Sequence, residues 1–221
     1  MFDYEPVFLA NLCKEGIETL AVYEARGGYR TLRRVLAEHS PAEVGAMVRA
    51  SGLRVLEAGA ERRVALRAIG DPAEAGTQDI VFICLKAHAL AEGAAALAPL
   101  VGPATTIVPA INGVPWWFTA ACGGALAGRV LRSVDPGGAI ARALPPSQVL
   151  GCVLHMAAAQ GETGTIHKGA GHVVVLGRPA CAGASVDEAG VAALVAAAGL
   201  ELQRTPRICD EVWLKLWGNM T

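Results

Sequence analysis

The stretch Asp79–Leu85, DIVFICL, is a continuous apolar run that opens with an acid and ends at Lys86. Such a run is typical of a strand that is buried on both faces of a parallel sheet. An Ala- and Leu-rich segment over residues 89–100 predicts a helix, and Thr105–Pro109 predicts a second buried strand before the turn at Asn112-Gly113. The order strand, helix, strand indicates a right-handed parallel unit with any ligand at the carboxyl ends of its strands.

Upstream of this unit the pattern is helical first and then alternating. Residues 16–38 predict a helix that is broken or restarted at Gly27-Gly28. Ser40, followed by a proline and then an acid, is typical of a helix start, so a second helix is expected over Pro41–Ala50. Apolar residues then alternate with polar ones over residues 53–68, on either side of a glycine, which predicts a β-hairpin.

Downstream, further strands and helices are expected. The strands are predicted over Gly128–Val134, Val149–Met156 and His172–Leu176, and the helices over Val186–Ala198 and Asp210–Thr221. The predicted fold is α/β, a partial Rossmann-like doubly wound sheet preceded by a short helical segment. The predicted domains are residues 1–50, 51–205 and 206–221, and the resemblance described below implies that the last of these is the first helix of a truncated helical C-terminal domain.

Composition narrows the classes of function. The 221 residues are 53% hydrophobic and carry a net charge of −1, so a basic surface for nucleic acid or membranes is not expected. The apolar stretches are too short to cross a membrane, and acids stand where a secretory signal would be basic. We therefore expect a cytoplasmic protein that handles a small molecule.

Six cysteines are scattered without a C-x-x-C pair, which predicts reduced and mostly buried thiols rather than a disulfide framework or a zinc site. The five-residue spacing of His167 and His172 does not place both rings on one helix face, so no metal site is expected there either.

Polar residues at strand ends and on the last helix are the candidate functional groups. Lys86 and Asn112 follow the two buried strands, although a surfacing lysine and a plain turn also explain them. Lys215 and Asn219 are four residues apart and share one helix face, although Lys215 would also suit a surface ion pair with Glu211. Trp213 and Trp217, at the same spacing, are expected to pack into a core.

Four motifs in this order resemble the ketopantoate reductase (2-dehydropantoate 2-reductase) family over residues 48–221. They are DIVFICLKAH at Asp79–His88, PAINGVPWW at Pro109–Trp117, SVDPGGA at Ser133–Ala139 and DEVWLKLWGN at Asp210–Asn219.

The resemblance implies a role for each candidate residue. Lys215 would be the general acid that protonates the substrate carbonyl, and Asn219 would orient the substrate. Asn112 would lie beside the nicotinamide and the substrate, and Lys86 would contact the NADPH cofactor. The implied function is an NADPH-dependent reductase of a 2-oxo acid, with a homodimer as one possible assembly.

Two departures from that family stand out. The G-x-G-x-x-G motif that holds the pyrophosphate is absent, and Ile111 stands where relatives often have glutamine. Instead, Tyr23–Leu36 (YEARGGYRTLRRVL) and Ser40–Arg54 resemble the start of the flavin-binding component of bacterial NADH-quinone oxidoreductase, its F subunit. The chain is therefore interpreted as chimeric, with a junction near residue 50.

The departures leave three hypotheses open. The first is a reductase impaired by truncation, which would leave out the cofactor loop and most of the helical C-terminal domain of the family. The second is a non-catalytic fragment in which residues 1–54 dock on a respiratory-complex partner. The third is a chain with uncovered strand edges and helix faces, which would dimerise or aggregate.

Overall fold

The computed structural model describes residues 41–123 and 125–220. The helix predicted over 16–38 lies outside these residues. The first described element is α3, Pro41–Ser51, which confirms the helix expected at this place. Arg49 near its end donates a hydrogen bond from Nη1 to the carbonyl of Ala68 at 3.0 Å, which ties the helix to the segment after the hairpin.

The predicted strand, helix, strand unit is present. Strand β3 spans Gln78–Ile83, α4 spans Ala87–Leu97 and β4 spans Val101–Pro109. The two strands are parallel, and Ile83 stands opposite Pro109 at their carboxyl ends. The α4 side chain of Leu90 is 2% exposed and packs in one cluster with β3 and β4, so the helix covers one face of the pair.

A three-stranded sheet continues beyond β4. It is formed by β5, Gly151–His155, β8, Val173–Gly177, and β9, Glu201–Arg204. Strand β8 is antiparallel to β5 and parallel to β9. A parallel bridge between Ile107 and Val149 joins this sheet to β4, and the amide of Leu150 donates to the carbonyl of Ile107 at 2.9 Å.

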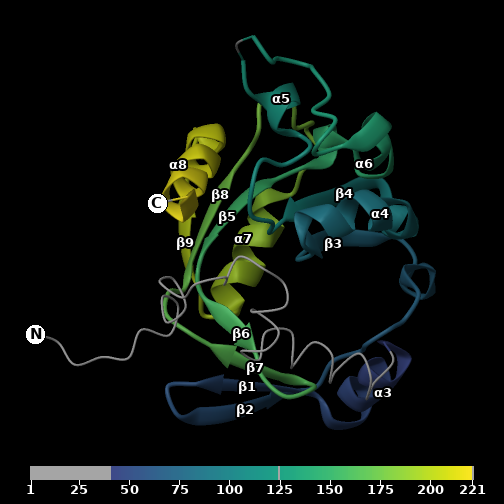
Figure 1. The fold of residues 1–221 in the computed structure, drawn as a ribbon, viewed down its shortest axis with the longest axis vertical. Coiled ribbons are helices and arrows are strands. Elements are labelled where there is room, and N and C mark those ends of the chain that lie inside the picture. Colours follow the sequence, from purple (N-terminus) through teal and green to yellow (C-terminus); the bar gives the residue numbers. More distant parts are fainter. Residues whose placement is uncertain (1–40, 124, 221) are drawn as a thin grey trace, which may run out of the picture.

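Two helices cover opposite faces of this sheet (Figure 1). They are α7, Glu188–Ala197, and α8, Ile208–Met220, and both agree with the predicted helices within a few residues. Alternate residues of a strand point to opposite faces. Accordingly, Val174 packs in a cluster with Val191 of α7, whereas Val175 packs in another with Ile208 of α8.

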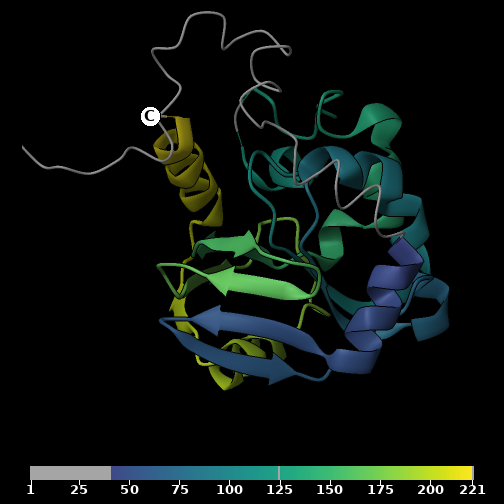
Figure 2. The ribbon, with the colours of Figure 1, turned by 60° about the horizontal axis from the view of Figure 1, so that its bottom comes forward.

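A second layer contains the predicted hairpin, β1, Leu53–Glu57, and β2, Ala60–Val64, which are antiparallel. Strand β1 also pairs with β7, Thr165–Lys168, and β7 pairs with β6, Ala158–Gln160. Figure 2 shows these four strands side by side in the order β2-β1-β7-β6. The strands β6, β7 and β9 are absent from the predicted set, because each has only three or four residues and so carries little alternating pattern.

The strand predicted over Gly128–Val134 is wrong, because this segment forms turns and irregular loop. Leu126 and Val130 are 50% and 57% exposed, so the apolar residues of this region do not line a sheet. Short helical pieces surround it: α5, Phe118–Ala121, η3, Pro136–Gly138, α6, Ala139–Ala143, and η4, Pro146–Gln148. Two further 3-10 turns belong to the region of the β3–α4–β4 unit: η1, Pro72–Ala75, precedes β3, and η2, Ala98–Leu100, joins α4 to β4.

The cysteine prediction is also wrong in two respects. Cys122 and Cys209, which are 87 residues apart, form a disulfide. Of the free cysteines in the described part, only Cys152 is buried, while Cys84 is exposed and Cys181 is half-buried. Sequence spacing could not reveal the pair, because the tertiary fold alone brings the end of α5 against the first turn of α8.

Within residues 41–123 and 125–220, no helix has the length and hydrophobicity of a membrane span. In the same residues no group of three or more His, Cys, Asp or Glu is placed to hold a metal ion.

Candidate active site

The carboxyl ends of β3 and β4 bring two predicted site residues to one edge. The amide of Ala110 donates to the carbonyl of Ile83 at 2.9 Å, so the two chains leave the sheet side by side. Lys86 lies three residues after Ile83, and Asn112 lies three residues after Pro109, its partner in the sheet. Neither Lys86 nor Asn112 is buried. Lys86 is also the N-cap residue of α4. Ligands of parallel sheets bind at such edges.

Asn112 and Lys215 line the same pocket. Its walls come from the loop after β4, from β5 and from α8, and comprise Pro109, Ile111, Asn112, Gly113, Pro115, Trp117, Cys152, Val153, Val212 and Lys215. Gly113 turns the loop with a φ of 94°, and a Cβ atom built there would meet nothing within 4 Å. The backbone therefore presents an open, unobstructed turn at this point.

Lys215 is half-buried, and its ammonium donates a hydrogen bond to the carbonyl oxygen of Leu154 on β5. Burial lowers the pKa of Lys215, and the nearby Cys152 acts in the opposite direction. Burial raises the pKa of Cys152 to about 12, so this thiol stays neutral at ordinary pH. The pocket thus holds one ammonium that releases its proton more readily than a lysine in water.

Close packing fixes the helix that carries Lys215. Ile208 is 2% exposed, and the side chains of Ile208 and Trp117 lie close to Gly151 of β5. A Cβ atom on Gly151 would lie 2.5 Å from Cγ1 of Ile208 and 3.3 Å from the Trp117 ring. Val212, one turn after Ile208, is 7% exposed in the same cluster. The start of α8 therefore sits directly on β5.

The structure does not bring all four predicted residues together. Asn219 is exposed, one helical turn beyond Lys215, and neither it nor Lys86 lines the pocket. Lys215 is bonded to Leu154 rather than to Glu211. Trp213 and Trp217 are 50% and 66% exposed, so the predicted core pair is wrong.

Sequence reasoning missed Cys152, Trp117 and Leu154 as neighbours of Lys215. Cys152 and Leu154 belong to a predicted strand, and Trp117 ends the motif PAINGVPWW, but neither signal says what these side chains face.

The described fold is α/β and Rossmann-like, and the comparisons with solved structures agree. A protein of Ralstonia solanacearum MolK2, described as a ketopantoate reductase, is 43% identical with a TM-score of 0.73 over 80% of this chain and 55% of its own. The 2-dehydropantoate 2-reductase of Porphyromonas gingivalis W83, at 22% identity and a TM-score of 0.58, covers 79% of this chain and 54% of that one and supports the fold alone.

Residues 33–118 match the family model described as Ketopantoate reductase PanE/ApbA. The 2-dehydropantoate 2-reductase of Mesorhizobium japonicum is 36% identical over 203 residues, which cover 89% of this chain and 62% of that protein. The chain is therefore similar to ketopantoate reductases, as its motifs predict, and the family model matches its residues 33–118. The chain spans less than two thirds of the length of these relatives.

The second resemblance is found as well. In Rhizobium meliloti, the F 2 subunit of NADH-quinone oxidoreductase is 33% identical over 120 residues, covering 48% of this chain and 28% of that protein. The ketopantoate reductase model begins at residue 33, which precedes the junction predicted near residue 50. The domain boundaries stay a prediction.

Proposed function

We propose that the chain acts as an NADPH-dependent reductase of a 2-oxo acid, of the ketopantoate reductase type. The observation that supports this most directly is the meeting of Lys215 and Asn112 in one pocket, beside the carboxyl edge of β3 and β4. These residues come from distant segments, and their pairing follows the roles that the family motifs imply for them.

Lys215 is proposed as the general acid. A ketone that is reduced to an alcohol develops negative charge on its oxygen, and a positioned ammonium stabilises that charge and then donates a proton. The half-burial of Lys215 lowers its pKa, which brings its proton donation closer to neutral pH. Asn112, from the pocket wall, is proposed to orient the substrate carbonyl and the cofactor ring. Asn219 is proposed to bind the 2-oxo acid substrate.

The described residues fit one end of the cofactor. No atom lies within 4 Å of the position that a Cβ would take at Gly113, and Lys86 at the N-terminus of α4 places positive charge at the same edge. When bound, NADPH would supply the hydride. The pyrophosphate end has no G-x-G-x-x-G loop anywhere in the sequence. We therefore expect weaker cofactor binding and lower turnover than in a reductase that has this loop.

An NADPH fluorescence titration of the purified chain tests the proposal. Saturable binding that is weakened in Lys86→Ala and kept in Lys168→Ala is expected, because Lys168 lies in the other sheet and pairs with Glu57. The chain should also oxidise NADPH in the presence of 2-oxo acids such as ketopantoate, and the variant Lys215→Met should lose this activity. Both results together would support the proposed reductase function. Absence of binding up to millimolar cofactor would overturn it.

A second candidate function rests on the similarity to the F 2 subunit of the NADH-quinone oxidoreductase. Residues 1–54 would then dock on a partner of the respiratory complex without catalysis. A pull-down with the tagged full chain, compared with a chain that begins at residue 41, would retain complex components only in the first case. Equal retention, or none, would remove this candidate.

A further inference from the structure

The Cys122–Cys209 disulfide joins the two segments that form the proposed active site. Cys122 directly follows α5, which continues the loop that carries Asn112. Cys209 is the second residue of α8, the helix that carries Lys215. The covalent bond therefore connects the loop and the helix whose side chains meet in the pocket, from outside that pocket.

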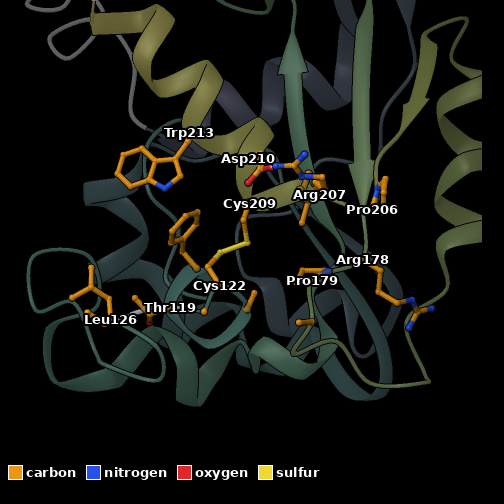
Figure 3. Close-up of a pocket in the computed structure, with 16 residues that line it drawn as sticks. Thr119, Cys122, Leu126, Arg178, Pro179, Pro206, Arg207, Cys209, Asp210 and Trp213 are labelled. Carbon is orange, nitrogen blue, oxygen red and sulfur yellow. A yellow bond between two sulfur atoms is a disulfide. The ribbon is translucent and has the colours of Figure 1, made fainter.

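The two cysteines also line a second pocket, on the other side of the disulfide. Both cysteines are half-buried and line a separate pocket of about 540 Å³ (Figure 3). This volume falls within the range that binds small organic molecules. Trp213 and Phe118 form an aromatic side of the pocket, with their rings edge to face at 5.7 Å. A molecule that enters this pocket therefore lies beside both cysteines.

The charged residues of this second pocket favour an anion. Two arginines, Arg178 and Arg207, line it against one acid, Asp210. Arg207 forms an ion pair with Asp210, whereas Arg178 donates to the carbonyls of Gly183 at 2.7 Å and Val186 at 2.8 Å. Carbonyl acceptors do not cancel the charge of Arg178, so the pocket keeps an excess of one positive charge.

We propose that Cys122–Cys209 is a thiol–disulfide exchange site for a small anionic thiol, and that its reduction loosens α8. The thiolate of the ligand attacks Sγ of Cys122, the Cys122–Cys209 bond breaks, and Cys209 leaves as a thiolate. The first amides of α8 stabilise that anion. A second ligand thiol then releases Cys122, so that two ligand thiols become one ligand disulfide while the protein gains two thiols.

Of the free cysteines in the described residues, Cys152 provides an internal control, and Cys84 and Cys181 can be replaced without changing the pocket lining. Cys152 is buried, and a buried thiol of raised pKa is a poor nucleophile. Cys84 and Cys181 do not line this pocket. Any effect of a loosened α8 on catalysis by Lys215 rests on the proposed function. Thiol–disulfide exchange at Cys122–Cys209 does not.

The first experiment follows exchange chemically. The chain with Cys84→Ser and Cys181→Ser is incubated under native conditions with glutathione or with glutathione monoethyl ester, which lacks one negative charge. Alkylation and peptide mass spectrometry then locate the products. We expect a mixed disulfide on Cys122 that forms several-fold faster with glutathione. Reaction that occurs only after denaturation would overturn the exchange site, and equal rates would overturn the preference for an anion.

The second experiment measures the effect on α8 without reference to activity. Hydrogen exchange of the amides over residues 212–216 is compared between the oxidised and the reduced chain, with α4 as the internal control. Protection that falls several-fold in α8 and stays constant in α4 is expected. Unchanged protection in α8 would overturn the coupling. If α8 loosens while NADPH still fails to bind, the proposed function alone is lost.

Discussion

Lys215 of α8 donates a hydrogen bond from its ammonium to the backbone carbonyl of Leu154 on β5. The bond holds the side chain along the sheet, beside the pocket that it shares with Asn112. The position of the ammonium therefore depends on the packing of α8 against β5, and changes in that packing should act on the proposed chemistry.

Replacement of Lys215 by methionine keeps most of the side-chain volume and removes the proton donor. We expect kcat for 2-oxo acid reduction to fall by about 10²–10⁴, the usual contribution of a general acid. The affinity for NADPH, measured by fluorescence, should change little. Full turnover in Lys215→Met would exclude this lysine as the acid.

The pH dependence follows from the lowered pKa of Lys215. A general acid must be protonated, so kcat should decline as pH rises through this pKa, below the ordinary lysine value of 10.5. Between the two values the unfolded chain binds more protons at this site than the folded one, so the free energy of unfolding should rise with pH there. Urea titrations across this range should show the rise, and it should disappear in Lys215→Met.

Substitution of Gly151 by alanine tests the contact between β5 and α8. The added Cβ would lie 2.5 Å from Cγ1 of Ile208, so we expect a loss of about 1–3 kcal/mol in the free energy of unfolding and a displaced α8. The matched control is Gly93→Ala in α4, where an added Cβ meets nothing within 4 Å and should stabilise by up to about 1 kcal/mol. Equal effects in urea denaturation would contradict this packing.

The buried carboxylate of Asp135 should hold the loop before α6. It accepts hydrogen bonds from the amides of Ile140 at 2.7 Å and Ala141 at 3.1 Å and is 3% exposed. Asp135→Ala leaves these amides without their acceptor and should cost about 2–3 kcal/mol. Asp71→Ala, which removes an exposed cap, should cost about 1 kcal/mol. Thermal denaturation of the two variants should rank them in this order.

Loss of the disulfide should lower stability. The bond closes a long loop, with its cysteines 87 residues apart, so Cys209→Ser is expected to cost about 2–4 kcal/mol in oxidised protein. Cys84→Ser, at an exposed free thiol, should change stability by less than about 0.5 kcal/mol. A strong reductant should bring the unchanged chain to the stability of Cys209→Ser.

Local patterns predicted most of the regular elements. The apolar run at Asp79–Leu85 became β3, and the alternation after residue 53 became the β1–β2 hairpin. The strand predicted over Gly128–Val134 is wrong because this segment forms turns, with Val130 exposed and Val134 packed against the core without strand pairing. Strands β6, β7 and β9 were not predicted, because a strand this short is recognised only by its hydrogen-bonded pairing with another strand.

The family motifs named Lys86, Asn112, Lys215 and Asn219 as site residues, and the structure places only Asn112 and Lys215 in one pocket. The identity of these residues could be predicted from the sequence, since a motif preserves residue types in order. The distances between their side chains could not.

The sequence by itself determined the α/β class, the β3–α4–β4 unit and the ketopantoate reductase motifs, because periodicity and side-chain chemistry act over a few neighbouring residues. Only the tertiary structure decided that Lys215 bonds Leu154, that Trp213 is exposed and that Cys122 meets Cys209. Each of these depends on how α8 packs on β5, and that packing depends on side chains far apart along the chain.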